Sequence, residues 1–136
     1  MTRVCLDSNV LVAAFAARGL CADLLALVIA EYELVVPELV AHEVRRVLTT
    51  KLQVGPPALA ILDAVFERCE VVPGAGAASP LKIRDPSDER ILAEAVGAAV
   101  EILVTGDDDL LSVAEQSPIR ILSPRAFITL ARGSTL

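Results

Sequence analysis

Aromatic residues and cysteines are scarce in this 136-residue chain, which has no tryptophan, one tyrosine, three phenylalanines and three cysteines. Proteins that bind single-stranded nucleic acid without sequence preference stack successive bases on aromatic side chains. The chain offers no such platform, which argues against broad single-strand binding by stacking. Cys5, Cys21 and Cys69 are odd in number and form no CxxC pair, so they indicate reduced thiols packed in a core rather than a disulfide framework.

Long uncharged apolar runs are also absent from the sequence, although 54% of the residues are hydrophobic and the mean hydropathy is +0.61. A membrane-spanning helix needs about 18 consecutive apolar residues. The longest candidates, residues 8–17 and 24–30, are ended by charges, and Asp7 interrupts the place where a signal peptide has its apolar region. We therefore expect a cytoplasmic protein with no membrane partner, forming a single domain over residues 1–136.

Short apolar segments with strand character alternate with segments of helical apolar spacing. The expected strands are residues 3–6, 34–36, 70–72, 102–104 and 119–122. The expected helices are residues 10–17, 22–30, 37–51, 59–68 and 85–100, with one more from residue 108 and one from residue 124. Strands this short and apolar indicate a parallel sheet covered on both faces. The expected fold class is α/β, with three α/β/α layers around a central parallel sheet of about four to five strands.

Four acidic residues fall at strand ends or on helix faces where hydrophobic residues are expected. Asp7 and Asp107 each follow an apolar strand, Glu43 interrupts an apolar helix face, and Asp88 opens a helix. In a parallel sheet ligands collect outside the carboxyl ends of the strands, where all four side chains can converge. Carboxylates are almost never fully buried without a partner, and the chain has no matching set of basic residues at these points. Hard divalent cations prefer oxygen ligands, so the set predicts a metal site.

Each of these acids also has a simpler structural explanation. Asp88 can belong to a capping box with Asp85 as the cap, and Asp107 can open a charged helix start favoured by the helix dipole. Glu43 is harder to explain, because a lone glutamate on an apolar stripe destabilises a fold unless a partner is present. Asp7 likewise has no nearby basic residue. These explanations must all hold together, so a metal site is the better interpretation.

Clustered carboxylates repel one another, by about 4 kcal/mol for two charges about 4 Å apart at an effective dielectric of about 20. One or two Mg²⁺ or Mn²⁺ ions remove this repulsion and supply the chemistry for hydrolysing a phosphodiester without a catalytic histidine or lysine. The only histidine, His42, is adjacent to Glu43 and therefore points about 100° away around the helix. This favours a surface or supporting role for His42.

Three motifs, together with Glu43, occur in an order and spacing that resemble the PIN-domain family. The opening Leu6, Asp7, Ser8, Asn9, Val10 is similar to the family pattern of Asp, Thr or Ser, Asn, Val. The runs Asp-Pro-Ser-Asp at residues 85–88 and Val-Thr-Gly-Asp-Asp-Asp-Leu-Leu at residues 104–111 look like the other two family signatures. The resemblance covers nearly the whole chain and is greatest to small prokaryotic toxins of toxin–antitoxin pairs, which are related to VapC-type ribonucleases.

The resemblance implies a PIN-like, doubly wound fold and a Mg²⁺- or Mn²⁺-dependent ribonuclease activity with one or two ions. By motif position, the catalytic carboxylates that hold the metal are Asp7, Glu43, Asp88 and Asp107, and Asp109 is a further metal ligand. Asn9 and Thr105 match positions that orient these ligands, Asp85 is a cap rather than a ligand, and Asp108 falls at a variable place. The implied partners are RNA and a cognate antitoxin. A homodimer fits the family habit and the apolar helices at residues 10–17 and 22–30.

The overall charge differs from that of most nucleic-acid-binding proteins, because the net charge is −6 and the pI about 4.7. Four of the negative charges belong to the expected metal site, which leaves −2 for the rest of the chain. Basic residues near Glu43 and Asp88 can line the mouth of this site and hold RNA phosphates; they are Arg45, Arg46, Lys51, Lys82, Arg84 and Arg90. A solvated helix face is the simpler explanation of the same residues.

Other classes built on this architecture fit the sequence less well. A haloacid-dehalogenase-like phosphatase needs a second Asp two residues after the first, where this chain has Asn9. A response-regulator receiver has its phosphoacceptor Asp after the third strand, where this chain has Pro73 and Gly74. The alternative that stays open is a PIN fold that holds metal but cleaves slowly or not at all, and acts as an RNA- or protein-binding scaffold.

Overall fold

The structure is a computed structural model, and it describes residues 1–74, 76 and 78–133. Within these residues the strands are β1 (Arg3–Leu6), β2 (Glu33–Pro37), β3 (Glu70–Val72), β4 (Ile102–Val104) and β5 (Arg120–Leu122). The α-helices are α1 (Ser8–Ala16), α2 (Leu20–Glu31), α3 (Glu38–Arg46), α4 (Pro56–Glu67), α5 (Pro86–Gly97), α6 (Asp108–Leu111) and α7 (Pro124–Gly133). A π-helical turn η1 (Val47–Lys51) extends α3, and a 3-10 turn η2 (Ala114–Gln116) precedes β5. No single described helix is long and apolar enough to cross a membrane; α1 and α2 reach that length only together, across a bend of 107°.

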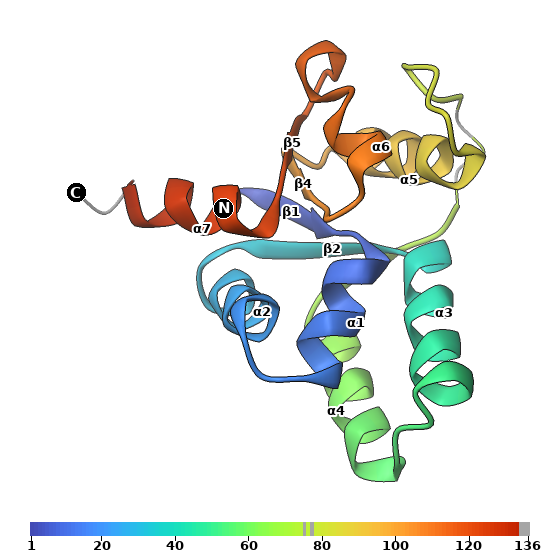
Figure 1. Cartoon of the computed structure of the whole chain (residues 1–136), viewed down its shortest axis with the longest axis vertical. Coiled ribbons are helices and arrows are strands. Elements are labelled where there is room, and N and C mark those ends of the chain that lie inside the picture. Colours follow the sequence, from blue (N-terminus) through green and yellow to red (C-terminus); the bar gives the residue numbers. More distant parts are fainter. Residues whose placement is uncertain (75, 77, 134–136) are drawn as a thin grey trace.

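All five strands run parallel, in the order β3-β2-β1-β4-β5. The central strand β1 places Cys5 opposite Val35 on β2 and Leu103 on β4. The chain builds the sheet from β1 outwards to β3, and then returns to add β4 and β5 on the other side of β1. Because parallel crossovers are right-handed, this reversal moves the connecting helices to the opposite face. Accordingly, α5 and α6 lie across the sheet from α1, α2, α3 and α4 (Figure 1). The predicted three-layer α/β/α fold with a parallel sheet of four to five strands is confirmed.

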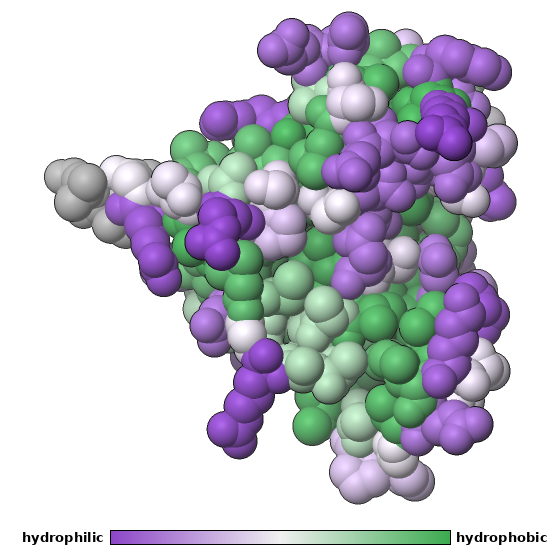
Figure 2. Space-filling model, in the orientation of Figure 1, coloured by the Kyte–Doolittle hydropathy of each residue, from purple (hydrophilic) through white to green (hydrophobic). Residues whose placement is uncertain are grey.

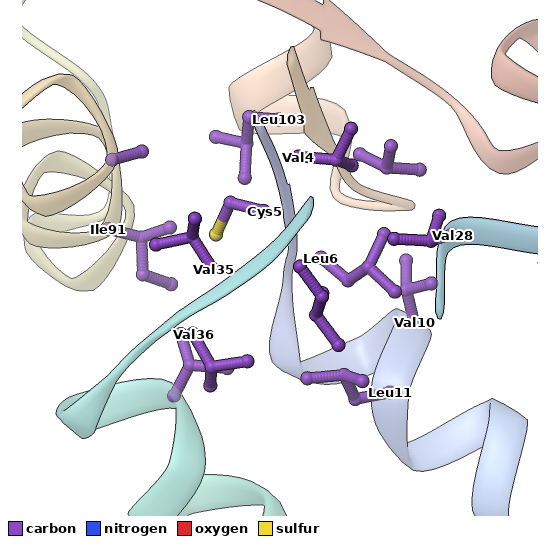
Figure 3. Close-up of a cluster of buried hydrophobic side chains, with 14 of the residues drawn as sticks. Val4, Cys5, Leu6, Val10, Leu11, Val28, Val35, Val36, Ile91 and Leu103 are labelled. Atoms are coloured by element: carbon purple, nitrogen blue, oxygen red, sulfur yellow. The ribbon is translucent and has the colours of Figure 1, made fainter. Parts of the chain in front are cut away.

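Side chains of β1 alternate between the two faces of the sheet, as expected for a strand. Cys5 points toward Ile91 on α5, whereas Leu6 points toward Leu11 on α1 (Figure 3). All four side chains are buried. The same alternation directs the next residue, Asp7, toward the face that α5 covers.

The three cysteines are free thiols that pack in or against this core. Cys5 is fully buried, and Cys21 and Cys69 are half-buried. Burial raises the pKa of all three thiols, that of Cys69 to about 11. The thiols therefore stay protonated near neutral pH, which agrees with the core packing that the sequence predicts.

Most elements begin and end within three residues of the predicted boundaries, and the third helix differs in two ways. The sequence pattern places Pro37 in the first turn of the third helix, but Pro37 ends β2 with an extended ψ of 144°, and the helix begins at Glu38. The helix does continue to Lys51, as predicted, but its hydrogen bonding changes from α to π at Val47.

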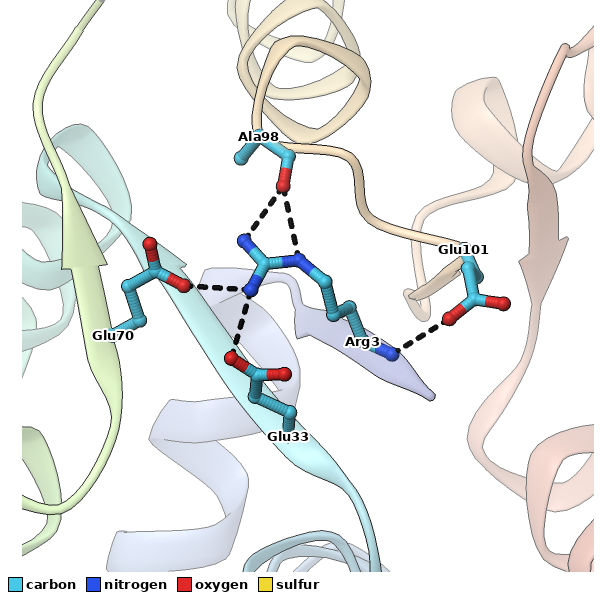
Figure 4. A network of polar contacts seen from close by, with 5 residues as sticks. All are labelled: Arg3, Glu33, Glu70, Ala98 and Glu101. Carbon is cyan, nitrogen blue, oxygen red and sulfur yellow. Dashed lines mark hydrogen bonds and ion pairs between the residues drawn. The ribbon is translucent and has the colours of Figure 1, made fainter. Parts of the chain in front are cut away.

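One arginine holds together the amino-terminal end of the sheet (Figure 4). Arg3 Nη1 donates to Glu33 Oε1 at 2.8 Å and to Glu70 Oε2 at 2.7 Å, which lie on the next two strands. Its Nε and Nη2 donate to the carbonyl oxygen of Ala98 at 3.1 and 2.7 Å. Its backbone N–H donates to Glu101 Oε2 at 3.0 Å. Arg3 thus ties β1 to β2, to β3 and to the turn between α5 and β4.

Candidate metal centre

Acidic side chains gather at the opposite, carboxyl-terminal end of the sheet, beside the central strand. Asp7 directly follows β1, Asp107 follows β4 in the next strand position, and Asp88 lies in the first turn of α5. At β1 the order of strand addition reverses, and open α/β sheets form ligand sites at such a reversal. The structure therefore places these three acids where the sequence pattern predicts.

Asp7 is held rigidly, because both of its oxygens accept hydrogen bonds. Oδ1 accepts from the backbone N–H of Ser8 at 2.7 Å, and Oδ2 accepts from Thr105 Oγ1 at 2.7 Å and from Asn9 Nδ2 at 3.3 Å. The side chain is only 3% exposed. Burial raises the pKa of Asp7, the hydrogen bonds from Thr105 and Ser8 oppose the rise, and the charges of Asp107 and Glu43 add to it.

Asn9 and Thr105 connect the segment after β1 to the segment after β4. Besides bonding Asp7, Asn9 accepts from the backbone N–H of Gly106 at 3.2 Å through Oδ1. Thr105 Oγ1 donates to Asp7 and accepts from the backbone N–H of Asp107 at 3.0 Å. The two side chains therefore set the position of Asp107 relative to Asp7.

The carboxylates of Asp88, Asp107 and Asp109 form the tightest acidic group, with one oxygen of each within 4.8 Å of the others. Asp88 is buried, and the other two are half-buried. Asp107 also caps α6, because its Oδ1 accepts from the backbone N–H of Asp109 at 2.7 Å. Asp108, between them, is exposed and outside the group. Asp109 thus lies with the predicted ligands, and Asp108 does not.

Asp88 is a buried carboxylate with an electrostatic penalty. It is 5% exposed, and its Oδ2 is buried without a hydrogen-bond partner among the described residues. Burial first, then the charges of Asp107, Asp85 and Asp7, and last a side-chain hydrogen bond with Asp107 that favours the protonated form, raise the pKa of Asp88 to about 7. A hard divalent cation would satisfy this oxygen and remove the repulsion, and three carboxylates suit the oxygen preference of Mg²⁺ or Mn²⁺. The residues therefore fit a divalent metal.

The hydrogen bonds around Asp88 also separate the two explanations that the sequence leaves open. Asp85 is the helix cap, since its Oδ1 accepts from the backbone N–H of Ser87 at 2.8 Å. A capping box would also require Asp88 to accept from the backbone N–H of Asp85. No such bond is present in the described part of the chain, and Asp88 instead lies with Asp107 and Asp109.

Glu43 faces the cluster from α3 without joining its tightest group. It is half-buried, at the edge of the helix stripe whose buried residues are Val40, Ala41 and Val44. It is not among the three carboxylates that approach within 4.8 Å. Its charge nevertheless raises the pKa of Asp7, and it lines a cavity together with Asn9. Its role as a metal ligand stays a prediction.

The structure separates the predicted RNA-binding arginines of α3. Arg45 forms an ion pair with Asp63 on α4. Arg46, the next residue, lines a cavity with Glu43 and with Arg90 of α5. Arg46 and Arg90 are both exposed, and hydrophilic side chains gather over α5 and α6 on the face in Figure 2. Arg46 and Arg90 thus line the same cavity beside Glu43, whereas Arg45 is paired with Asp63.

Lys82 and Arg84 are exposed on the segment before α5, and Lys51 is exposed at the end of η1. The position of the segment before α5 depends on Glu89, a residue that the sequence reasoning missed. The buried Ile83 donates its backbone N–H to Glu89 Oε2 at 3.0 Å, which holds the segment against the first turn of α5. Nothing in the sequence distinguishes Glu89 from any acid in the first turn of a helix.

Comparison with known proteins identifies the family and the fold. The family model described as PIN domain matches residues 3–109, a range that contains every acid described above. The structure of VapBC2 from Rickettsia felis, bound to a DNA fragment from the promoter, is 18% identical with a TM-score of 0.63 and covers 89% of this chain and 97% of that chain. The DNA-bound VapBC of Salmonella typhimurium is 18% identical with a TM-score of 0.64, over 91% of this chain and 99% of that chain. Identity this low establishes the fold alone. No curated protein matches the sequence.

Proposed function

This chain belongs to the PIN-domain family, and we propose that it is a metal-dependent endoribonuclease that hydrolyses RNA phosphodiester bonds as the toxin of a toxin–antitoxin pair. The proposal rests mainly on Asp88 Oδ2, a buried oxygen without a hydrogen-bond partner among the described residues, in a group with Asp107 and Asp109. Burying a carboxylate beside two others destabilises a fold unless a ligand compensates. A group of carboxylates that destabilises the fold without a bound cation supports a function that uses a bound cation.

In this proposal Asp88, Asp107 and Asp109 hold one or two Mg²⁺ or Mn²⁺ ions, and Asp7 and Glu43 complete the set from β1 and α3. A divalent cation bound there supplies the positive charge that polarises a phosphodiester and activates water for hydrolysis. Thr105 and Asn9 keep the Asp7 carboxylate fixed toward the group, because each donates to its Oδ2. The catalytic residues are Asp7, Glu43, Asp88 and Asp107.

The same proposal assigns further properties to the chain. The two similar structures named above are of VapBC bound to DNA, which supports a cognate antitoxin protein as a partner. We also assign to it the cytoplasm as location, a homodimeric state, and one domain over residues 1–136. The RNA contacts fall to the basic residues around the acids, of which Arg46 and Arg90 lie beside Glu43.

A second candidate function is a PIN scaffold that binds RNA or protein and cleaves slowly or not at all. The acidic net charge of −6 and the scarcity of aromatic residues favour it, because both weaken general affinity for RNA. The two candidates differ in turnover rather than in fold.

The test is cleavage of a mixed panel of structured and single-stranded RNAs with Mn²⁺ or Mg²⁺. Parallel reactions contain EDTA, the Asp7→Asn variant, or Asp108→Asn as a matched control, because Asp108 is exposed and outside the acidic group. Cleavage that is lost with EDTA and in Asp7→Asn, but kept in Asp108→Asn, is the expected result. RNA binding without cleavage across the whole panel would instead favour the scaffold.

A further inference from the structure

A cavity of about 440 Å³ opens between α3 and α5, next to the acidic group. Its lining residues are Leu39, His42, Glu43, Arg46, Ser87 and Arg90. Glu43 belongs to the proposed metal set, and Ser87 directly precedes Asp88. We propose that this cavity is a subsite for one nucleotide of the RNA, adjacent to the cleaved phosphodiester, with Arg46 and Arg90 binding its phosphate. The inference rests on the proposed function for the identity of the substrate, but not for the binding of a nucleotide.

The two arginines are free to bind an anion, unlike Arg3 and Arg45. Arg3 is engaged by Glu33 and Glu70, and Arg45 is engaged by Asp63. Among the described residues, the side chains of Arg46 and Arg90 form no ion pair or hydrogen bond. They come from different helices and line the same cavity. Guanidinium groups in this arrangement suit bidentate recognition of a phosphate.

The charge around the acidic group explains why such a subsite is needed. The chain carries a net charge of −6, so its overall field repels a polyanion. A metal compensates the acids at the reacting phosphate, but the neighbouring phosphates of the strand still approach Asp7, Asp88 and Asp107. Two uncompensated arginines next to Glu43 counter that repulsion locally. RNA binding therefore depends on this pair more than on the net charge of the surface.

The size and remaining lining of the cavity suit a nucleotide rather than a free phosphate alone. Its volume falls within the range of about 300–1,000 Å³ typical of small-ligand sites. Leu39 provides an apolar surface for a base or ribose, and a guanidinium plane can stack on a base where aromatic side chains are lacking. The Ser87 hydroxyl and the His42 ring provide hydrogen-bonding groups for the sugar or base edge.

The cavity at the other end of the sheet provides an internal contrast. It measures about 370 Å³ and is lined by Arg3, Glu70 and Glu94 among others. Its arginine is already bonded to Glu33 and Glu70, and two of its lining residues are acidic. A phosphate would gain no free cation there. The α3–α5 cavity is thus selected by its unengaged arginines rather than by its size.

The first experiment measures nucleotide binding without any metal. Adenosine 5′-monophosphate is titrated into the full chain in EDTA, and the backbone amide NMR signals of His42, Ser87 and Arg90 are followed. We expect saturable shifts at these amides, and at least about tenfold weaker binding in the double variant Arg46→Gln/Arg90→Gln, which loses the charge-assisted bonds to phosphate. The charge-matched control Arg18→Gln/Arg68→Gln removes two exposed arginines outside the cavity and should bind like the parent.

The second experiment measures RNA cleavage by the same proteins. The Arg46→Gln/Arg90→Gln variant should raise KM about tenfold or more with little change in kcat and none in Mn²⁺ affinity, because it loses substrate binding rather than metal ligands. An unchanged KM and unchanged nucleotide affinity would overturn the subsite. So would arginine-dependent binding of polyglutamate with no binding of the nucleotide. Arginine-dependent nucleotide binding by a protein that cleaves no RNA would support the subsite and count against the ribonuclease.

Discussion

At the amino-terminal end of the sheet Arg3 bonds Glu33, Glu70 and Ala98, whereas at the carboxyl-terminal end the buried Asp88 has an oxygen with no hydrogen-bond partner among the described residues. Both ends belong to the same five strands, and both bring acids from separate elements together. The first end contains its own cation. The second gathers three carboxylates within 4.8 Å of one another, and two unengaged arginines line the adjoining cavity.

The difference shows at which end of the sheet the chain compensates its own charges and at which end a bound ligand would compensate them. Acids that are paired within the chain stabilise the folded state modestly. Acids that are buried together raise the free energy of the folded state until something external neutralises them. The two ends should therefore respond in opposite ways to mutation, pH and metal, and each response below tests that contrast.

The largest effect should come from neutralising the acid with the unpartnered oxygen. Asp88→Asn should lower metal-dependent RNA cleavage by about 100-fold or more, since even residues that only orient metal ligands affect activity or metal affinity by about 10–100-fold. In EDTA the same variant should have a higher melting temperature than the parent, because it removes a buried charge. Asp108→Asn, an exposed acid in the same region, should change neither quantity. If Asp88→Asn still cleaves RNA like the parent, Asp88 is not part of the catalytic site.

The next effect is a dependence of stability on pH in the metal-free protein. The pKa of Asp88 is about 7 when folded and about 3.9 when unfolded, so the folded state binds the proton more tightly. Its contribution to stability is fully present below pH 4 and is lost as the pH rises from about 4 to about 7. The loss is a few kcal/mol, at about 1.4 kcal/mol for each pKa unit.

Urea denaturation in EDTA at pH 5, 6 and 7 measures this loss, and Asp88→Asn is the control because it lacks the titrating group. The parent should lose stability across this range relative to Asp88→Asn. Saturating Mn²⁺ at pH 7 should restore the stability of the parent and leave the stability of the variant nearly unchanged. Identical pH profiles for the two proteins in EDTA would show that Asp88 does not carry the buried charge.

A smaller effect is expected at the paired end of the sheet. Arg3→Met should lower the free energy of unfolding by about 2 kcal/mol, because Ala98 O and two carboxylates lose their donor. The estimate stays modest since the side chains of Glu33 and Glu70 are 44% and 47% exposed, so water replaces part of the loss. Cleavage per folded molecule and Mn²⁺ affinity should not change. Arg18→Met is the control at an exposed arginine, and a change in Mn²⁺ affinity without a change in stability would contradict the assignment.

The smallest effect concerns Glu89, an acid near the acidic group whose side chain bonds another segment of the chain. Glu89→Ala should destabilise the protein by about 1 kcal/mol and speed hydrogen exchange of the Ile83 amide, which loses its acceptor. Glu89→Gln keeps a carbonyl acceptor and should leave the exchange rate close to that of the parent. Equal exchange rates in all three proteins would mean that Glu89 does not hold the segment before α5.

Much of the fold follows from local patterns in the chain. Short apolar runs predict the strands at residues 3–6 and 102–104. The acids Asp7 and Asp107, which follow these runs, are visible in the same pattern. The role of Asp85 as a cap is likewise local, because a cap bonds only the next turn. The helix from Glu38 to Arg46 is predictable too, but its stripe pattern did not show that Glu43 lies at the edge of the buried face rather than within it.

The sequence does not predict contacts between residues that lie far apart in the chain. Nothing in the sequence around Arg3 predicts its four partners, which lie far away along the chain; Glu101, for example, is 98 residues away. The adjacent residues Arg45 and Arg46 look equivalent in the sequence, yet one pairs with Asp63 and the other lines the cavity with Arg90. Neighbours on a helix point in directions about 100° apart, so only the packing of α3 against α4 and α5 separates them.

The sequence by itself determined the order of strands and helices, the burial of the inner strands β1, β2 and β4, and the acids that follow β1 and β4, because residue periodicity and caps act over one or two turns of chain. The tertiary structure alone decided which charges are satisfied. Thr105 reaches Asp7 across 98 residues, and Asp88, Asp107 and Asp109 meet only when α5 packs against the sheet. Pairing depends on distances in space, and these exist only once the crossovers have brought β1 and β4 side by side.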